Sequence, residues 1–244
     1  MGMDDSVSAV ERARSGLARM IAAGELQAGE LLPPESVLCE RFEVSRSSLR
    51  EAQKMLTVAG VLTPRPGSRS AVSDMSADQI MRGLQMVLPL LPLDRYLELF
   101  TLREVLEGHV AAQAAARMSE ADRLRLVELE AQLASAEPSD DAQRLDAEFH
   151  ALIIRSAGDE MIAALLETIR RRGRDYRIFE EEAHAELKQV SDHAHGEITA
   201  AILARDPETA RFLAMQHVRV TRSWLEGIRP GPILFEGGPG VPVD

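Results

Sequence analysis

The sequence has a single cysteine, few aromatic residues and no long apolar run. Only 4% of its 244 residues are aromatic, and the one cysteine, Cys39, cannot form an internal disulfide, so stability depends on core packing. The longest apolar stretch, 86–93, is interrupted by Pro89 and Pro92 and is too short to span a bilayer. The first sixteen residues contain no apolar segment typical of a secretory signal. We therefore expect a cytoplasmic protein without membrane association.

The sequence also lacks the excess of positive charge that is typical of proteins that coat nucleic acids. Its formal net charge is −11, but residues 1–73 hold nine basic and nine acidic residues, so the whole deficit falls in 74–244. Within 41–69, six basic residues stand against two acidic ones. Such a patch can pair with phosphates, while the acidic remainder discourages unselective DNA coating. The charge distribution favours sequence-selective DNA binding.

The chain is long enough for two domains, each with its own core. In residues 1–73, helical periodicity at 7–22, 35–42 and 45–60 precedes a short hairpin pattern around Pro66-Gly67, which predicts a winged helix-turn-helix domain. Residues 74–93 are predicted to be a connector. Residues 94–226 show only helical periodicity, which predicts an antiparallel all-α bundle, and 227–244 an irregular tail. Helices are expected at 94–118, 120–136, 140–157, 159–184, 186–205 and 207–226.

The third predicted helix begins with residues suited to DNA. Ser45 is a good N-cap, and Arg46, Ser47 and Arg50 lie on the face opposite the apolar stripe that begins with Leu49. An arginine can donate two hydrogen bonds to a guanine, and serine hydroxyls at a helix N-terminus suit phosphate oxygens. The alternative is an ordinary solvated arginine face.

At these residues the sequence resembles the GntR family of bacterial regulators. The matching stretches are GELQAGELLPPE, LCERFEVSRSSLREA and PRPGS. The resemblance implies that Arg46 and Arg50 read bases and that Ser45, Ser47 and Ser48 contact phosphates or base edges. It also implies that Arg65 and Gly67 form part of the wing tip. Two positions depart from the family pattern: Ser36 replaces a frequent arginine, and Arg69 replaces the second wing glycine and could enter a minor groove.

Four residues of the C-terminal half form a candidate metal site. Asp146 and His150 are four residues apart and project from one face of a predicted helix, while His195 and His217 lie on two later helices separated by the Asp206-Pro207 turn. One carboxylate and three imidazoles suit a divalent transition metal and leave coordination positions open. The alternative is that each histidine is a surface residue or a satisfied core residue.

Residues from about 95 to 226 resemble the FCD effector domain of the FadR subfamily. The stretches that carry the resemblance are LREVLEGHVAAQAAARM, DAEFH and HGEITAAILARDPETARFLAMQH. The resemblance implies that Asp146, His150, His195 and His217 bind a metal, most often zinc but nickel or manganese in some members, beside a small carboxylate effector. The family's asparagine after the Ala-Gly turn is Asp159 here.

The resemblance also implies an effector-binding arginine, Arg103, on the first bundle helix. Its guanidinium could hold a carboxylate with two hydrogen bonds. A salt bridge with Glu107, one turn away, is an equally supported alternative. His193 competes with His195 for the ligand position, but only His195 has the family spacing, and His109 and His184 are expected to take no part.

The sequence therefore predicts a transcription regulator and not an enzyme. We expect a repressor that binds an inverted-repeat operator in double-stranded DNA as a homodimer, because two-fold pairing doubles the DNA surface that one winged helix covers. The alternatives are a metal-dependent hydrolase or lyase that uses the Asp/His set, or a metal-buffering or structural helical protein. The sequence contains no H-E-x-x-H, nucleophile elbow or phosphate loop that would support the enzyme.

Overall fold

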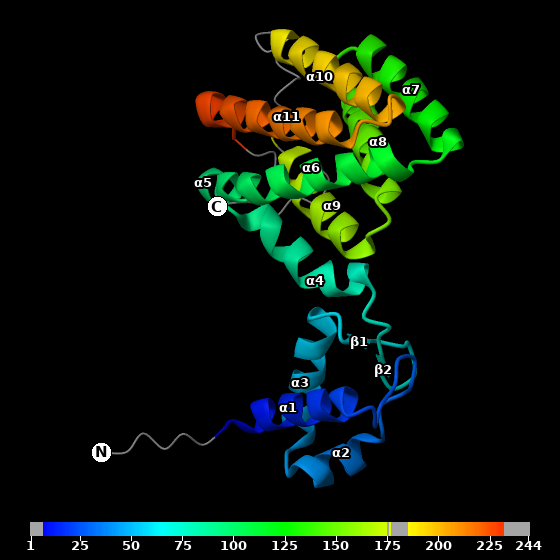
Figure 1. Ribbon diagram of the computed structural model, residues 1–244. Coiled ribbons are helices and arrows are strands. Elements are labelled where there is room, and N and C mark those ends of the chain that lie inside the picture. Colours follow the sequence, from blue (N-terminus) through cyan, green and yellow to red (C-terminus); the bar gives the residue numbers. More distant parts are fainter. Residues whose placement is uncertain (1–6, 175, 177–184, 232–244) are drawn as a thin grey trace. The chain divides into compact units, whose positions relative to one another are not determined.

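The computed structural model describes residues 7–174, 176 and 185–231. The chain divides into two compact units, Met1–Met86 and Val87–Asp244, and the division lies inside the predicted connector 74–93. The fold is mainly helical, as the sequence predicts (Figure 1). None of the helices in the described part of the chain has the length and hydropathy needed to cross a bilayer.

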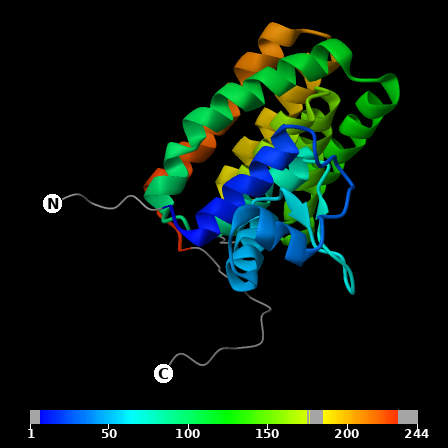
Figure 2. The same ribbon diagram turned by 90° about the horizontal axis from the view of Figure 1, so that it is seen from below.

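The N-terminal unit is the predicted winged helix-turn-helix. Its elements are α1 (Ala9–Ala22), α2 (Glu35–Phe42), α3 (Arg46–Val58), β1 (Leu62–Thr63) and β2 (Ala71–Val72). The two strands pair antiparallel, with Leu62 opposite Val72, and their connecting turn projects away from the helices (Figure 2). The bridge from Leu31 to Ala71 ties the segment between α1 and α2 to this small sheet.

The turn between α2 and α3 is short because both helix ends are capped within it. Glu43 takes a left-handed conformation, with φ of 55°, and its N–H closes the end of α2. Two residues later Ser45 caps α3 through its side chain. The apolar stripe of Leu49, Ala52 and Leu56 is buried in the core of this unit, so the opposite face of α3 is left to solvent.

Gly60 ends α3 at a position that only glycine can occupy. Its φ is +76°, and a Cβ there would lie 1.8 Å from the carbonyl oxygen of Gln79. The chain then passes through β1 and β2 to α4 (Ala77–Val87), which is followed by the 3-10 turn η1 (Leu88–Leu90). The predicted connector is therefore mostly helical, and α4 ends two residues before Pro89.

The C-terminal unit is a helical bundle. Its helices are α5 (Leu93–Glu98), α6 (Phe100–Arg117), α7 (Glu120–Ser135), α8 (Asp140–Ser156), α9 (Glu160–Arg174), α10 (Ala185–Leu203) and α11 (Pro207–Ile228). The prediction of a single helix at 94–118 was wrong, because the helix is interrupted at Leu99. The N–H of Leu99 donates to the carbonyl oxygen of Tyr96, three residues back, and not to that of the residue four back. The parts of the predicted 159–184 helix and irregular tail at 175, 177–184 and 232–244 lie outside the described residues.

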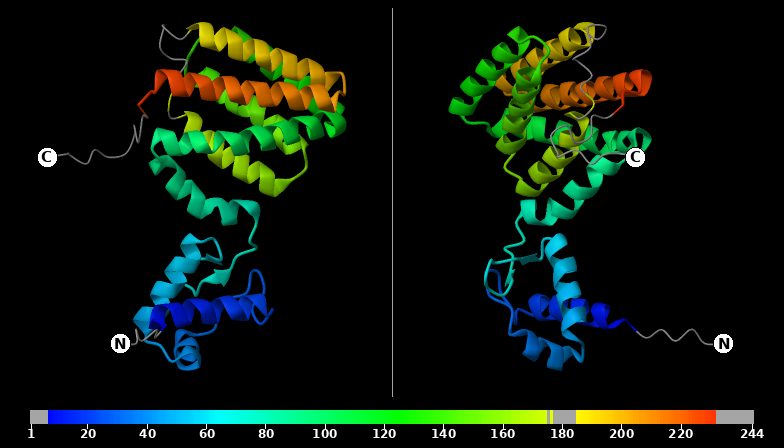
Figure 3. Two further views of the ribbon diagram at one scale, coloured as in Figure 1. Left: turned by 60° about the vertical axis from the view of Figure 1, so that its left-hand side comes forward. Right: turned by 180° about the vertical axis from the view of Figure 1, so that it is seen from behind.

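The core of the bundle places α8, α10 and α11 around a common interior. The helix α11 packs against α6 and α10 (Figure 3), and Phe149 of α8 is fully buried. Arg123 of α7 is also buried, and its guanidinium donates to carbonyl oxygens of Ala115 and Ile202 at 3.1 and 3.2 Å. Because these carbonyls lie near the ends of α6 and α10, Arg123 caps both helices and fixes their relative position.

Candidate functional site

The N-terminus of α3 is ordered by three serines. The backbone N–H of Ser48 donates to Ser45 Oγ at 3.2 Å, and the hydroxyls of Ser47 and Ser48 lie 2.8 and 2.9 Å from the same oxygen. Arg46, Ser47 and Arg50 are exposed on this end of the helix. The structure thus brings the five predicted DNA contacts of α3 to one exposed helix start.

Arg50 is held by a residue that was not among the predicted DNA contacts. Its Nε and Nη2 atoms donate to the two carboxylate oxygens of Glu35 on α2, at 2.9 and 3.0 Å. This hydrogen bonding lowers the pKa of Glu35, so the carboxylate stays charged beside the arginine. The bidentate pair fixes the plane of the guanidinium and leaves its outer edge directed away from Glu35.

The wing residues differ in how they are used. Arg65 is exposed at the start of a tight turn in which the Ser68 N–H donates to its carbonyl oxygen at 3.1 Å, and Gly67 supplies the positive φ of 69°. Arg69 is also largely exposed, but its Nη1 donates to the carbonyl oxygen of Leu32 at 2.7 Å. Arg69 therefore braces the wing against the segment before α2.

Three histidines from three helices meet inside the C-terminal unit. His150 lies on α8, His195 on α10 and His217 on α11, and all three are buried. Each offers a ring nitrogen within 4.8 Å of those of the other two. The Nε2 atoms of His150 and His195 are 3.2 Å apart, and Asp146 Oδ1 lies 3.5 and 3.6 Å from them. The three imidazoles thus converge, and Asp146 lies beside two of them.

The histidines of this cluster are held neutral. Burial, followed by the neighbouring His150 and by Arg170, lowers the pKa of His195 to about 3. Burial also lowers the pKa of His150 and His217, and the other imidazoles add to the effect at His217. Neutral imidazoles have free lone pairs, which is the form that binds a metal ion.

Two acids, Glu107, which is buried, and Asp146, which is partly buried, face two arginines beside the histidines. Arg170 of α9 donates to Glu107 Oε2 at 2.8 Å and to Asp146 Oδ2 at 3.3 Å. Burial opposes ionisation of Glu107, but the charges of Arg103 and Arg170 outweigh it and lower its pKa to about 2. Burial likewise opposes ionisation of Asp146, and His150 and Arg170 more than compensate, so its pKa is also lowered. Both acids are carboxylates at neutral pH.

Arg103 makes the salt bridge that the sequence offered as the alternative to an effector contact. Its Nε donates to Glu107 Oε1 at 2.8 Å, and its Nη1 lies 3.5 Å from the hydroxyl of Tyr96. The side chain is only 5% exposed. Arg103 nevertheless lines the cavity described below, so the salt bridge orients the guanidinium without removing it from the cavity wall.

The geometry of Asp146, His150 and His195 fits a divalent metal, and His217 offers a ring nitrogen within 4.8 Å of the other two imidazoles. Two ligands bound at 2.0–2.1 Å in a tetrahedron stand about 3.3–3.4 Å apart, close to the separations among Asp146, His150 and His195. His150 Nδ1 lies 4.0 Å from Glu107 Oε2, so a carboxylate stands near the second ring nitrogen without a direct hydrogen bond to it. The donor set, one carboxylate and three neutral imidazoles, could bind such an ion.

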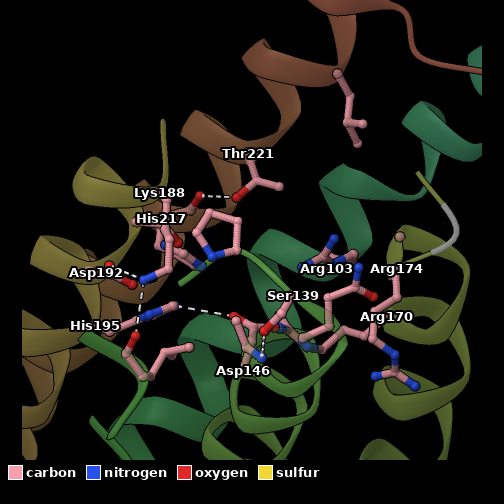
Figure 4. Close-up of a pocket in the computed structure, with 17 residues that line it drawn as sticks. Arg103, Ser139, Asp146, Arg170, Arg174, Lys188, Asp192, His195, His217 and Thr221 are labelled. Atoms are coloured by element: carbon pink, nitrogen blue, oxygen red, sulfur yellow. Dashed lines mark hydrogen bonds and ion pairs between the residues drawn. The ribbon is translucent and has the colours of Figure 1, made fainter. Parts of the chain in front are cut away.

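A cavity of about 110 Å³ opens beside the histidines (Figure 4). Arginines lie on one side and α10 on the other, with Ser139 and Asp146 between them and Thr221 of α11 on the wall as well. The charged and ligand-bearing residues of its wall are Arg103, Asp146, Arg170, Arg174, Lys188, Asp192, His195 and His217. A space of this size beside the candidate metal ligands can hold a small polar molecule.

Three residues of the cavity wall were not predicted from the sequence: Arg170, Lys188 and Asp192. Arg170 carried a usable signal, because it lies four residues after the buried Leu166 and so falls in the inward stripe of α9. The signal for Lys188 and Asp192 was weaker: they precede His195 by seven and three residues, a spacing that places them on the same helix face. Asp159 caps α9 by accepting from the Ile162 N–H at 2.9 Å, and it is not among the cavity residues.

Comparison with known proteins gives matches over both units. Residues 9–72 match the family described as bacterial regulatory proteins, gntR family, and residues 98–220 match the FCD domain. The Glc operon transcriptional activator of Escherichia coli K12 is 28% identical over 86% of each chain. The HTH-type transcriptional regulator LutR of Bacillus subtilis is 29% identical over 62% of this chain and 68% of its own.

Among solved structures, Streptococcus agalactiae GntR is similar, with a TM-score of 0.51 and 27% identity. The similarity covers 88% of this chain and 99% of that chain. The matched segments contain the start of α3, the hairpin and all four residues that converge inside the bundle.

Proposed function

Since this chain belongs to the GntR family of bacterial regulatory proteins and carries an FCD domain, we propose that it is a FadR-subfamily repressor controlled by a small carboxylate. It is a DNA-binding transcription regulator, and its family and relatives are regulators and not enzymes. The hydrolase or lyase alternative is therefore set aside. A regulator that binds DNA would act in the cytoplasm.

The observation that carries the proposal is the cavity that adjoins Asp146, His195 and His217. Asp146, His150, His195 and His217 would hold a divalent metal there, zinc by its preference for imidazole ligands, with nickel or manganese as the alternatives. Such an ion supplies an open coordination position for an anionic oxygen. Arg103 and Arg170 on the same wall would orient the carboxylate of the effector.

DNA recognition is proposed to lie at the start of α3 and in the hairpin. Arg46 and Arg50 would read guanines, since both are exposed at a helix end suited to the major groove. Ser45, Ser47 and Ser48 would contact phosphates or base edges. The wing would contribute Arg65 and Gly67, and Arg69 would act from the same hairpin, through the brace that it makes to Leu32 and through its remaining donors.

Coupling between the units would pass through the connector, residues 74–93, between the DNA-binding domain at 1–73 and the effector domain at 94–226. Two chains would pair as a homodimer, so that their recognition helices bind the two halves of an inverted repeat. A ligand that repositions α8, α10 and α11 would change the spacing of the two recognition helices in the dimer. The coupling free energy between two such sites is typically about 1 to 3 kcal/mol.

The test is a selection of duplex DNA from a random pool by the full chain, followed by titration at physiological salt. We expect a two-fold symmetric site, and Arg46→Ala and Arg50→Ala should each weaken its binding by about 1 to 3 kcal/mol and relax guanine preference. Arg19→Ala removes an exposed arginine of α1 and should leave the preference unchanged. An asymmetric single site contradicts the dimer, and wild-type binding by both α3 variants contradicts the assigned contacts.

A further inference from the structure

The wall of the cavity formed by α10 contains an ion pair that the proposed metal and carboxylate contacts do not use. Lys188 Nζ lies 2.6 Å from Asp192 Oδ2 and donates to the carbonyl oxygen of Leu133 at 3.0 Å. The two side chains are 11% and 16% exposed, and both line the cavity together with His195 (Figure 4). An ion pair that is so far removed from solvent and yet borders a cavity is placed to contact a ligand.

The pair retains one donor and one acceptor for such a ligand. An ammonium has three N–H donors, of which Lys188 uses two in these contacts. Within the described residues, Oδ1 of Asp192 has no hydrogen-bond partner, whereas Oδ2 is bound by Lys188. A ligand hydroxyl complements both groups, since it can accept from Lys188 and donate to Asp192.

The charges of the pair argue against a second carboxylate on the ligand. Lys188 and Asp192 together carry no net charge, so they offer little attraction to another anion, and Asp192 would repel it at short range. Burial raises the pKa of Asp192, whereas Lys188 opposes that rise by hydrogen bonding to it. An uncharged hydroxyl satisfies both partners without adding a charge to this wall.

The spacing along α10 sets the distance between the two ends of the ligand. Asp192 and Lys188 precede His195 by three and seven residues, which corresponds to about 4.5 and 10.5 Å along the helix axis. A carboxylate bound at the histidines therefore places a hydroxyl near Asp192 when two or three carbons separate the groups. The cavity of about 110 Å³ agrees with this length, since a cavity of about 150 Å³ holds benzene.

We propose that Lys188 and Asp192 select a short carboxylate bearing a hydroxyl two or three carbons from the carboxyl carbon. This inference rests on the proposed function, because it places the carboxylate end at the metal centre. It adds a specificity that the metal, Arg103 and Arg170 do not supply, since these three recognise only the carboxylate.

The experiment compares four acids by calorimetry on the full chain loaded with one equivalent of Zn²⁺: butyrate, 3-hydroxybutyrate, 4-hydroxybutyrate and succinate. At least one hydroxy acid should bind about tenfold or more tightly than butyrate, because a partly buried polar pair left without a partner weakens binding. Succinate should bind no more tightly than butyrate. In the double variant Lys188→Met with Asp192→Leu, this preference should fall to about onefold, while the affinity for butyrate and the zinc content stay near wild type. Gln189→Met, exposed on the same helix, is the matched control and should retain the preference.

The outcomes separate this inference from the proposed function. Equal binding of the hydroxy acids and butyrate by the wild-type chain overturns the hydroxyl selection alone, as does a preference that survives in the double variant. Tighter binding of succinate than of either hydroxy acid overturns it as well. If none of the four acids binds the zinc-loaded wild type, the carboxylate site of the proposed function fails, and the inference fails with it.

Discussion

The hydrogen bonds between Glu35 and Arg50 at the start of α3 can be tested by a single substitution. Glu35 binds Nε and Nη2 of the guanidinium, so it orients the side chain without covering its outer edge. We expect Glu35→Gln to lower the ratio of operator to non-operator affinity about two- to tenfold, because Arg50 loses its fixed plane while the helix gains net positive charge. Titrations with the selected site and with single guanine replacements measure this ratio.

The matched control for this substitution is Glu40→Gln, which removes an exposed acid from the same helix α2. It changes the charge equally but has no role in orienting Arg50. A ratio that falls equally in both variants would show that charge alone accounts for the effect and that Glu35 does not position the arginine.

The residues of the site differ in how far the sequence predicted their surroundings. His150, His195 and His217 could be grouped from their spacing and family pattern, and the structure brings them together. Arg103 could not be resolved from sequence, since a helix allows Glu107 at i+4 to contact it in either role. Arg170, Lys188 and Asp192 were missed because a charged residue on a helix is usually solvated, and only tertiary packing shows that these three border a cavity.

At the scale of elements, α8, α10 and α11 meet through imidazoles that must be neutral when the chain is folded. His195 has a pKa of about 3 in the fold, against about 6.5 unfolded, so between these values only the unfolded chain binds the proton. The metal-free protein should therefore lose stability as the pH falls below about 6.5. Between pH 7.5 and 5.5, His195 alone should lower the free energy of unfolding by about 1 kcal/mol.

Urea unfolding followed by the fluorescence of Trp224, the single tryptophan and a residue of α11, measures this slope in the presence of a chelator. His195→Gln should make the pH dependence shallower, whereas His193→Gln, with an exposed ring on the same helix, should not. Equal slopes for the wild type and His195→Gln would contradict the assignment of a neutral buried imidazole at His195.

Helix ends were predictable where a capping residue marks them, and not where packing alone decides. Ser45 and Gly60 bound α3, and Gly24 follows α1, because side-chain caps and positive φ values are local properties. The break at Leu99 has no such signal, since the apolar periodicity continues through it. There α5 and α6 are divided where the N–H of Leu99 donates to the carbonyl oxygen of Tyr96, three residues back.

At the scale of the whole molecule, charge and function are separated along the chain. The net charge of −11 lies outside residues 1–73, while the basic excess within 41–69 covers α3 and the hairpin. This distribution explains how an acidic protein binds DNA selectively: the basic patch contacts phosphates, and the acidic remainder disfavours other sites. The bundle is then free to carry the proposed ligand site, whose occupancy would change DNA binding.

The metal centre is tested most directly by the metal content of the full chain after incubation with excess Zn²⁺ and gel filtration, determined by elemental analysis. We expect about one ion per wild-type chain and almost none in the double variant His150→Ala with His217→Ala, since loss of two of four ligands removes tight binding. Wild-type protein without stoichiometric metal, or a double variant that retains it, would contradict the metal centre on which the proposed control of DNA binding depends.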